Sequence, residues 1–190
     1  MNQTLRQHLL KQRGQLTQAF VQEKSSCIAK RLQALEQYRQ AKNVAFYYAV
    51  KGEVSLEALW RTSARQGKQC FFPVCRGDDM LFVPVTPKTP FIRHSLGVLE
   101  PDVPLSEAIT VNQLDIALMP LVAFDEFGVR MGMGKGFYDR AFASFNQKAS
   151  TQPLRLGIGY EFQRQGIIEK QPWDVLVHGT ITEKNIYWTR

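Results

Sequence analysis

The sequence predicts a single α/β domain with a mostly parallel sheet and helices at the N-terminus. Three features support this prediction. The first 40 residues have the apolar spacing of helices, the run NVAFYYAV at 43–50 is almost wholly apolar, and the segment 43–74 reads as strand, helix, strand. Continuous apolar runs are typical of strands buried on both faces. A strand–helix–strand order is typical of a right-handed crossover between parallel strands.

Two helices are expected within the first 40 residues, separated at Gly14. Leu5, Leu9 and Leu16 keep a rough helical stripe, and Thr17 is a candidate N-cap for the second helix.

Arg6 and Arg13 are seven residues apart, so they would share one face of the first helix. Position alone leaves two interpretations open for this pair. The simpler one is a solvated basic face, and the sharper one is that one of the two arginines reaches a phosphate.

A turn is expected at 51–53, followed by a helix with Ser55 as its N-cap and with Leu56, Leu59 and Trp60 facing inward. Further strands are predicted at 69–74, 81–85, 114–120 and 154–160, with one or two short strands in 179–188. Turns are expected at 76–79 and 125–128, a loop at 86–113, which holds four prolines, and a helix from Gly136 onward with Phe137, Ala141 and Phe145 on one side.

Composition limits the classes of partner. Lys and Arg number 24 against 17 Asp and Glu, which gives a net charge of +7 and favours an anionic partner. The basic residues are spread along the chain, which disfavours nucleic acid. No apolar stretch reaches the length of a bilayer span, and the N-terminus lacks the apolar core of a signal peptide. With three cysteines and no C-x-x-C pair, these features predict a cytoplasmic protein with free thiols.

A glycine-rich segment is the strongest functional signal. Gly132, Gly134 and Gly136 alternate, with Arg130 and Lys135 close by. Because alternating glycines lack Cβ atoms, their backbone N–H groups can turn toward one anion. A guanidinium and an ammonium group both suit phosphate oxygens. The segment is neither a P-loop nor a dinucleotide fingerprint, because Lys135 is followed by glycine. The alternative is a glycine-rich hairpin with incidental charges.

Asp139 lies one helical turn beyond these glycines. A carboxylate beside a phosphate cradle is suited to hold a magnesium ion that the phosphates also bind.

The run DIALMPLVAFDEFGVRMGMGKGFYDR at 115–140 resembles the signature of the 5-formyltetrahydrofolate cyclo-ligase (5,10-methenyltetrahydrofolate synthetase) family. Shorter matches extend the resemblance over nearly all 190 residues. In family order they are L-R at 5–6 ahead of Arg13, FYYAVKGEV with G-E at 52–53, E-P at 100–101, W-D at 173–174 and I-T-E at 181–183.

The resemblance implies one domain over residues 1–190 with a three-layer α/β/α sandwich. It also implies a ring closure that depends on magnesium and ATP, in which 5-formyltetrahydrofolate becomes 5,10-methenyltetrahydrofolate with release of ADP and phosphate. The formyl oxygen would first accept the γ-phosphoryl group, so that N10 of the folate can attack and phosphate can leave.

Site residues follow from the same resemblance. Lys135 and Arg130 would be catalytic, and Asp139 and Asp174 would hold magnesium. The ATP-binding residues would be Asn2, Gln3, Thr4, Leu5, Arg6, Arg130, Gly132, Met133, Gly134, Lys135, Gly136, Phe137 and Tyr138. The folate-binding residues would be Tyr48, Glu53, Met133, Gly134, Lys135, Gly136 and Phe137, with Glu53 accepting hydrogen bonds from the pterin. Asn2 and Met133 stand where relatives often carry Lys and Arg.

Two other functions remain open on the sequence. One is an ATP-dependent relative that acts on another N-acylated substrate, which the retained Gly52-Glu53 pair disfavours. The other is a noncatalytic nucleotide- or RNA-binding protein, which the combination of Lys135 and Asp139 disfavours. We expect a monomer whose partners are 5-formyltetrahydrofolate and ATP, with no nucleic-acid or membrane partner.

Overall fold

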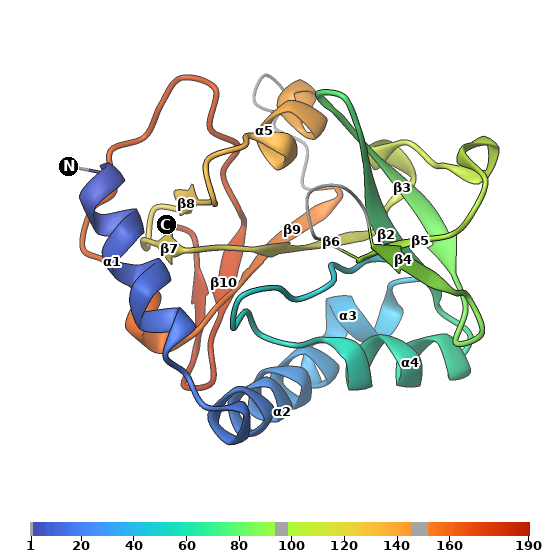
Figure 1. Ribbon diagram of the computed structural model, residues 1–190, viewed down its shortest axis with the longest axis horizontal. Helices are drawn as coiled ribbons and strands as arrows, with labels where there is room; N and C mark the ends of the chain where they lie inside the picture. Colours follow the sequence, from blue (N-terminus) through green and yellow to red (C-terminus); the bar gives the residue numbers. More distant parts are fainter. Residues whose placement is uncertain (1, 94–98, 146–151) are drawn as a thin grey trace.

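A seven-stranded sheet forms the centre of the protein in a computed structural model that describes residues 2–93, 99–145 and 152–190. The strand order is β11-β10-β9-β6-β1-β2-β3 (Figure 1). All pairings are parallel except β2 with β3 and β10 with β11, so the prediction of a mostly parallel sheet is confirmed. The strands are β1 (Asn43–Ala45), β2 (Gln69–Arg76), β3 (Asp79–Val85), β6 (Ile116–Pro120), β9 (Leu154–Ile158), β10 (Gly179–Ile181) and β11 (Ile186–Trp188).

Both faces of the sheet are buried, as the continuous apolar strands predict. In β6, Ile116 and Leu118 join the apolar cluster on one face, whereas Ala117 and Met119 join the cluster on the other. Helices α2 (Gln18–Ala34), α3 (Glu36–Gln40) and α4 (Glu57–Arg65) cover the first face, and the short α5 (Phe137–Ala141) covers the second (Figure 1). The layers therefore follow the expected α/β/α order, and the helical layer on the second face, which contains the short α5, is the thinner one.

The N-terminal helices form as expected. Helix α1 (Asn2–Gly14) ends at Gly14, and the side chain of Thr17 caps α2 by accepting a hydrogen bond from the Phe20 N–H at 3.2 Å. Helix α1 lies at one end of the sheet, beside a small hairpin (Figure 1). The interpretation of Arg6 and Arg13 as a solvated basic face is wrong for Arg13, whose exposed fraction is only 1%.

Strand β1 is shorter than the predicted 43–50. The ladder continues only to the bond from Phe46 N–H to Phe71 C=O, after which the chain leaves the sheet toward a turn at residues 51–52. Residues 46 and 47 are buried beyond the sheet, so their apolar character reflects packing rather than strand pairing.

Helix α4 begins one residue later than predicted. Its N-cap is Leu56, and the Ser55 hydroxyl accepts only a long bond, 3.4 Å, from the Glu57 N–H. The prediction that Leu56, Leu59 and Trp60 face inward is confirmed, since all three are buried.

The proline-rich segment 86–113 is not wholly loop. It contains the antiparallel pair β4 (Phe91–Arg93) and β5 (Leu99–Pro101) and two 3-10 turns, Leu105–Glu107 and Val111–Gln113. The predicted helix from Gly136 divides into α5 and a 3-10 turn at Ala143–Phe145, and a further 3-10 turn spans Glu161–Gln163. Within the described ranges, no helix has both the length and the apolar character that a bilayer span requires.

Arg155 on β9 packs against His178, which precedes β10. The backbone N–H of Arg155 donates to Nδ1 of His178 at 3.0 Å, and the Arg155 guanidinium lies 3.1 Å from Nε2. Burial, and secondarily the charge of Arg155, lowers the pKa of His178 from 6.5 to about 4. The imidazole is therefore neutral in the folded protein at neutral pH.

His178 should make the stability of the protein depend on pH. Because its pKa is lower in the folded than in the unfolded chain, its contribution is present above pH 6.5 and is lost as the pH falls to about 4. Screening at this half-buried ring limits the loss to about 1–2 kcal/mol. Denaturant unfolding of the wild type and of His178→Asn over this range should show a smaller loss of stability in the variant. Equal losses of stability in the wild type and the variant would contradict the lowered pKa of His178.

Candidate active site

A cavity of about 550 Å³ opens at the carboxyl ends of β1 and β6. From β1 the chain crosses to β2 on one side, and from β6 it crosses to β9 on the other. Ligands of open parallel sheets bind at such a switch point, because the two chain crossings diverge there and leave a crevice. The volume lies within the range of ordinary ligand pockets. Tyr47 and Tyr48 line it after β1, and Pro120 and Leu121 line it at the end of β6.

The glycine segment forms one wall of this cavity. The strands β7 (Ala123–Phe124) and β8 (Arg130–Met131) form a hairpin. The loop 132–136 follows β8 directly and connects it to α5. Gly134 has φ +97° and Gly136 has φ +66°, values that favour glycine because a Cβ atom would clash with the backbone. The expectation that glycines are needed for the backbone path is confirmed at these two positions.

Two buried donors on this wall lack partners. Arg130 is 6% exposed, and its Nη2 forms an ion pair with Oδ1 of Asp139 at 3.0 Å. In the part of the chain that is described, Nε of Arg130 and the hydroxyl of Tyr138 have no hydrogen-bond partner. Burial raises the pKa of Tyr138, so this hydroxyl stays protonated. Because unpartnered buried donors are rare in folded proteins, these two groups suit a ligand rich in oxygen acceptors.

Helix α1 reaches the same wall from the side. Arg6 Nε donates to the carbonyl oxygen of Gly132 at 3.0 Å, and both Arg6 and Asn2 line the cavity. Asn2 also donates to the carbonyl oxygen of Glu169 at 3.0 Å. Gln3, Thr4 and Leu5, which the resemblance also places at the nucleotide, do not line the cavity: the first two are exposed, and Leu5 packs against the apolar cluster around Leu9.

Asp139 and Asp174 both line the cavity. Oδ1 of Asp139 accepts from Arg130 and from the Val175 N–H at 3.3 Å, and Oδ2 of Asp174 accepts from the Gln171 N–H at 2.8 Å. Each carboxylate keeps its second oxygen without a partner among the described residues. Carboxylate oxygens suit a hard cation such as Mg²⁺. No cluster of three acidic, His or Cys side chains occurs in the described ranges, so the ligand or water would complete the coordination.

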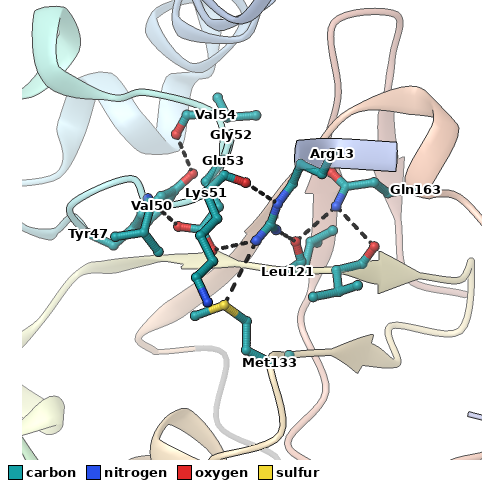
Figure 2. A network of polar contacts seen from close by, with 12 residues as sticks. Arg13, Tyr47, Val50, Lys51, Gly52, Glu53, Val54, Leu121, Met133 and Gln163 are labelled. Carbon is teal, nitrogen blue, oxygen red and sulfur yellow. Dashed lines mark hydrogen bonds and ion pairs between the residues drawn. The ribbon is translucent and has the colours of Figure 1, made fainter. Parts of the chain in front are cut away.

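Glu53 also lines the cavity. It is 6% exposed, so it is not a surface residue of its turn. Its Oε1 lies 3.4 Å from Nη2 of Arg13, and its Oε2 accepts from the Val50 N–H at 3.0 Å (Figure 2). Burial raises the pKa of Glu53, and the charge of Arg13 opposes that rise.

Tyr48 is half-buried and lines the cavity, with its ring 5.7 Å from the ring of Phe91. Tyr48, Tyr47 and Glu53 also line a smaller adjoining pocket of about 240 Å³. The structure thus brings Tyr48 and Glu53 to the same cavity as Asn2, Arg6 and the glycine segment.

Trp173 lines the cavity and Arg13 holds two of its backbone segments, although the family resemblance assigned a ligand to neither residue. Arg13 gave no signal beyond its spacing from Arg6, because its partners lie more than 35 residues away in the sequence. Trp173 lines the cavity next to Asp174, and the W-D pair at 173–174 pointed to this site only through the family resemblance.

Comparison with known proteins agrees with this arrangement. Residues 1–183 match the model of the 5-formyltetrahydrofolate cyclo-ligase family. The chain is 33% identical to the 5-formyltetrahydrofolate cyclo-ligase of Haemophilus influenzae over 176 residues, covering 91% of this chain and 92% of that protein. It is 31% identical to the enzyme of the same name from Escherichia coli K12 over 181 residues, covering 92% and 96%.

A solved structure is similar over the whole chain. The NMR structure of the 5,10-methenyltetrahydrofolate synthetase of Aquifex aeolicus superposes with a TM-score of 0.85 at 29% identity. The match covers 100% of this chain and 93% of that one.

Proposed function

The chain belongs to the 5-formyltetrahydrofolate cyclo-ligase family, and from this premise we propose that its cavity of about 550 Å³ holds ATP, magnesium and 5-formyltetrahydrofolate together. The activity is that of the family: the enzyme cyclises 5-formyltetrahydrofolate to 5,10-methenyltetrahydrofolate in folate one-carbon metabolism. The observation that carries the proposal is the pair of unpartnered buried donors, on Arg130 and Tyr138, in the cavity that Glu53 also lines.

The nucleotide phosphates would lie against the loop 132–136. Arg130 offers its free Nε, Arg6 holds the loop through the Gly132 carbonyl, and Lys135 adds an exposed, mobile charge. Such donors suit phosphate oxygens, whose charge they neutralise. Asn2 and Arg6 would supply the contacts from α1, and contacts from Gln3, Thr4 and Leu5 stay a prediction.

Asp139 and Asp174 would hold Mg²⁺ through their free oxygens. When bound there, the ion would neutralise charge that develops on the transferred phosphoryl group. Arg130 orients the Asp139 carboxylate through their 3.0 Å ion pair.

The pterin ring would lie against Glu53 and Tyr48. A carboxylate oxygen can accept two hydrogen bonds. Oε2 of Glu53 accepts one from the Val50 N–H, and Oε1 forms the ion pair with Arg13. One acceptor position per oxygen remains for a ring N–H and an amino group of the pterin. The half-buried ring of Tyr48 supplies apolar contact.

Phosphoryl transfer explains why the enzyme needs both substrates in one cavity. The formyl oxygen attacks the γ-phosphorus, the bond to ADP breaks, and the formyl carbon is left with a good leaving group. N10 of the folate then attacks that carbon and loses its proton to solvent, and the C–O bond breaks with release of phosphate. The residues of the chain contribute positioning and charge stabilisation, which are the main components of catalysis in such transfers.

We also propose that the enzyme is a cytoplasmic monomer. All three cysteines are free, and Cys70 donates to the Trp60 carbonyl while burial raises the pKa of its thiol to about 12, so it is a stable thiol.

The activity is tested by mixing the protein with 5-formyltetrahydrofolate, ATP and Mg²⁺ and following the near-ultraviolet absorbance of the methenyl product. Product should form only when all three are present, with one ADP released per product. ATP hydrolysis without product would contradict the choice of substrate and favour another N-acylated compound.

Lys135→Ala should lower turnover at saturating ATP by about 100-fold, because it removes a charge that stabilises the transferred phosphoryl group. The side chain is exposed, so the folded state should persist, as circular dichroism would confirm. Lys184→Ala, on an exposed turn between β10 and β11, is the matched control and should keep full turnover. Near-normal turnover of Lys135→Ala would show that this lysine has no catalytic role.

Asp139→Asn should raise the Mg²⁺ concentration needed for half-maximal activity by about tenfold, because an amide oxygen binds a hard cation less strongly than a carboxylate. Asp174→Asn should move it in the same direction. Asp78→Asn, on the exposed turn before β3, controls for the loss of one negative charge. An unchanged magnesium dependence in both site variants would exclude these carboxylates as ligands.

A further inference from the structure

Arg13, near the end of α1, carries a fully buried guanidinium that does not itself line the cavity. Its Nε donates to the Lys51 carbonyl at 3.0 Å, its Nη1 donates to the Leu121 carbonyl at 3.0 Å, and its Nη2 lies 3.4 Å from Oε1 of Glu53 (Figure 2). We infer that Arg13 is a positioning residue for folate binding, which holds the Glu53 carboxylate in place and in its charged form. This inference rests on the proposed role of Glu53 as the acceptor for the pterin.

The turn that carries Glu53 depends on Arg13 for its shape. Lys51 has φ +49°, a left-handed conformation that is unfavourable for a residue with a side chain. Its carbonyl is held by Arg13, and Gly52 packs so closely that a Cβ atom there would lie 2.5 Å from the Arg13 carbonyl oxygen. The hydroxyl of Tyr160 donates to the Gly52 carbonyl at 3.1 Å from the other side. The turn is therefore fixed between α1 and the end of the sheet.

The same guanidinium also contacts the end of β6 and the glycine loop. The Leu121 carbonyl at the end of β6 accepts from Arg13 and also from Gln163 at 3.0 Å (Figure 2). Nη2 of Arg13 lies 3.9 Å from the sulfur of Met133 in the glycine loop. Since α1 also carries Arg6, which holds the Gly132 carbonyl, one helix connects the folate side and the nucleotide side of the cavity.

Arg13 is the principal positive charge near Glu53. Two positive charges act on this carboxylate: the guanidinium of Arg13 from α1 and the ammonium group of Lys51 in the same turn as Glu53. The backbone N–H of Val50 donates a hydrogen bond to it. The other titratable groups that interact with it are neutral hydroxyls, those of Tyr47, Tyr138 and Tyr160. Burial raises the pKa of Glu53, and Arg13 opposes it more than the Val50 N–H or Lys51 does. Without Arg13, Glu53 would bind a proton at higher pH. A protonated carboxyl has lost acceptor capacity and presents a donor to the N–H groups of the pterin.

The test is the pH dependence of the KM for 5-formyltetrahydrofolate at saturating ATP, in the wild type, Arg13→Gln and Arg13→Lys. In Arg13→Gln the acidic limb, where KM increases as the pH falls, should move to higher pH by about one unit. A shift of that size makes KM about tenfold higher on that limb. The turnover number and the KM for ATP should change less than about threefold. Arg13→Lys keeps the positive charge and should restore most of the wild-type profile.

If Arg13 only stabilised the fold, its substitution would not change the pH dependence of the KM. If Arg13→Gln lowered the melting temperature but left the pH profile of the folded enzyme unchanged, the inference would be overturned. Equal increases in KM at every pH, with no shift of the acidic limb, would overturn it too.

A double variant keeps the inference testable if Arg13→Gln does not fold. Arg13→Gln combined with Glu53→Gln contains no unpaired buried charge, so it should fold more readily than Arg13→Gln alone. Its KM for the folate should equal that of Glu53→Gln, because Arg13 would act through Glu53. A further tenfold increase in the double variant would overturn the inference.

Glu53→Gln separates failure of this inference from failure of the proposed function. If Glu53→Gln leaves the KM for the folate unchanged, then Glu53 does not bind the pterin and the proposed function of this residue is wrong. If Glu53→Gln raises KM while Arg13→Gln shifts no acidic limb, only the role of Arg13 is wrong.

Discussion

A buried charge at the end of α1 joins three parts of the protein that are distant in sequence. The guanidinium of Arg13 donates hydrogen bonds to the carbonyl oxygens of Lys51 and of Leu121 at the end of β6. It also forms an ion pair with the carboxylate of Glu53, in the same turn as Lys51. A buried ion pair is a weak source of net stability, since its desolvation offsets much of the attraction. Removing one partner nevertheless costs about 3–5 kcal/mol, a large part of the stability of an ordinary domain. The pair therefore constrains the site more than it stabilises the fold.

The sheet determines where that constraint acts. The crossings from β1 and from β6 diverge, and the glycine loop and the Glu53 turn both line the crevice between them. Arg130 and Tyr138 carry donors without a partner among the described residues, and Glu53 and Tyr48 line the same crevice. An anionic nucleotide and a pterin would each find suitable partners there. Their reacting ends would meet in a cavity of about 550 Å³.

Local patterns in the sequence predicted much of this structure. The apolar run of β6, the cap at Thr17 and the glycines at 134 and 136 depend on neighbours a few residues away, so they can be predicted from the sequence. The early end of β1 was not predictable, because residues 46 and 47 are apolar for packing outside the sheet. The burial of Arg13 and Glu53 was not predictable either, because their ion pair spans 40 residues and each side chain alone resembles a surface charge.

The central claim is that the formyl oxygen of the folate accepts the γ-phosphoryl group of ATP within this cavity. It is tested most directly with 5-formyltetrahydrofolate that carries ¹⁸O in the formyl group, by mass spectrometry of the phosphate released. The account predicts that the phosphate gains one ¹⁸O atom for each methenyl product formed. Unlabelled phosphate, with the ¹⁸O recovered in water, would contradict it.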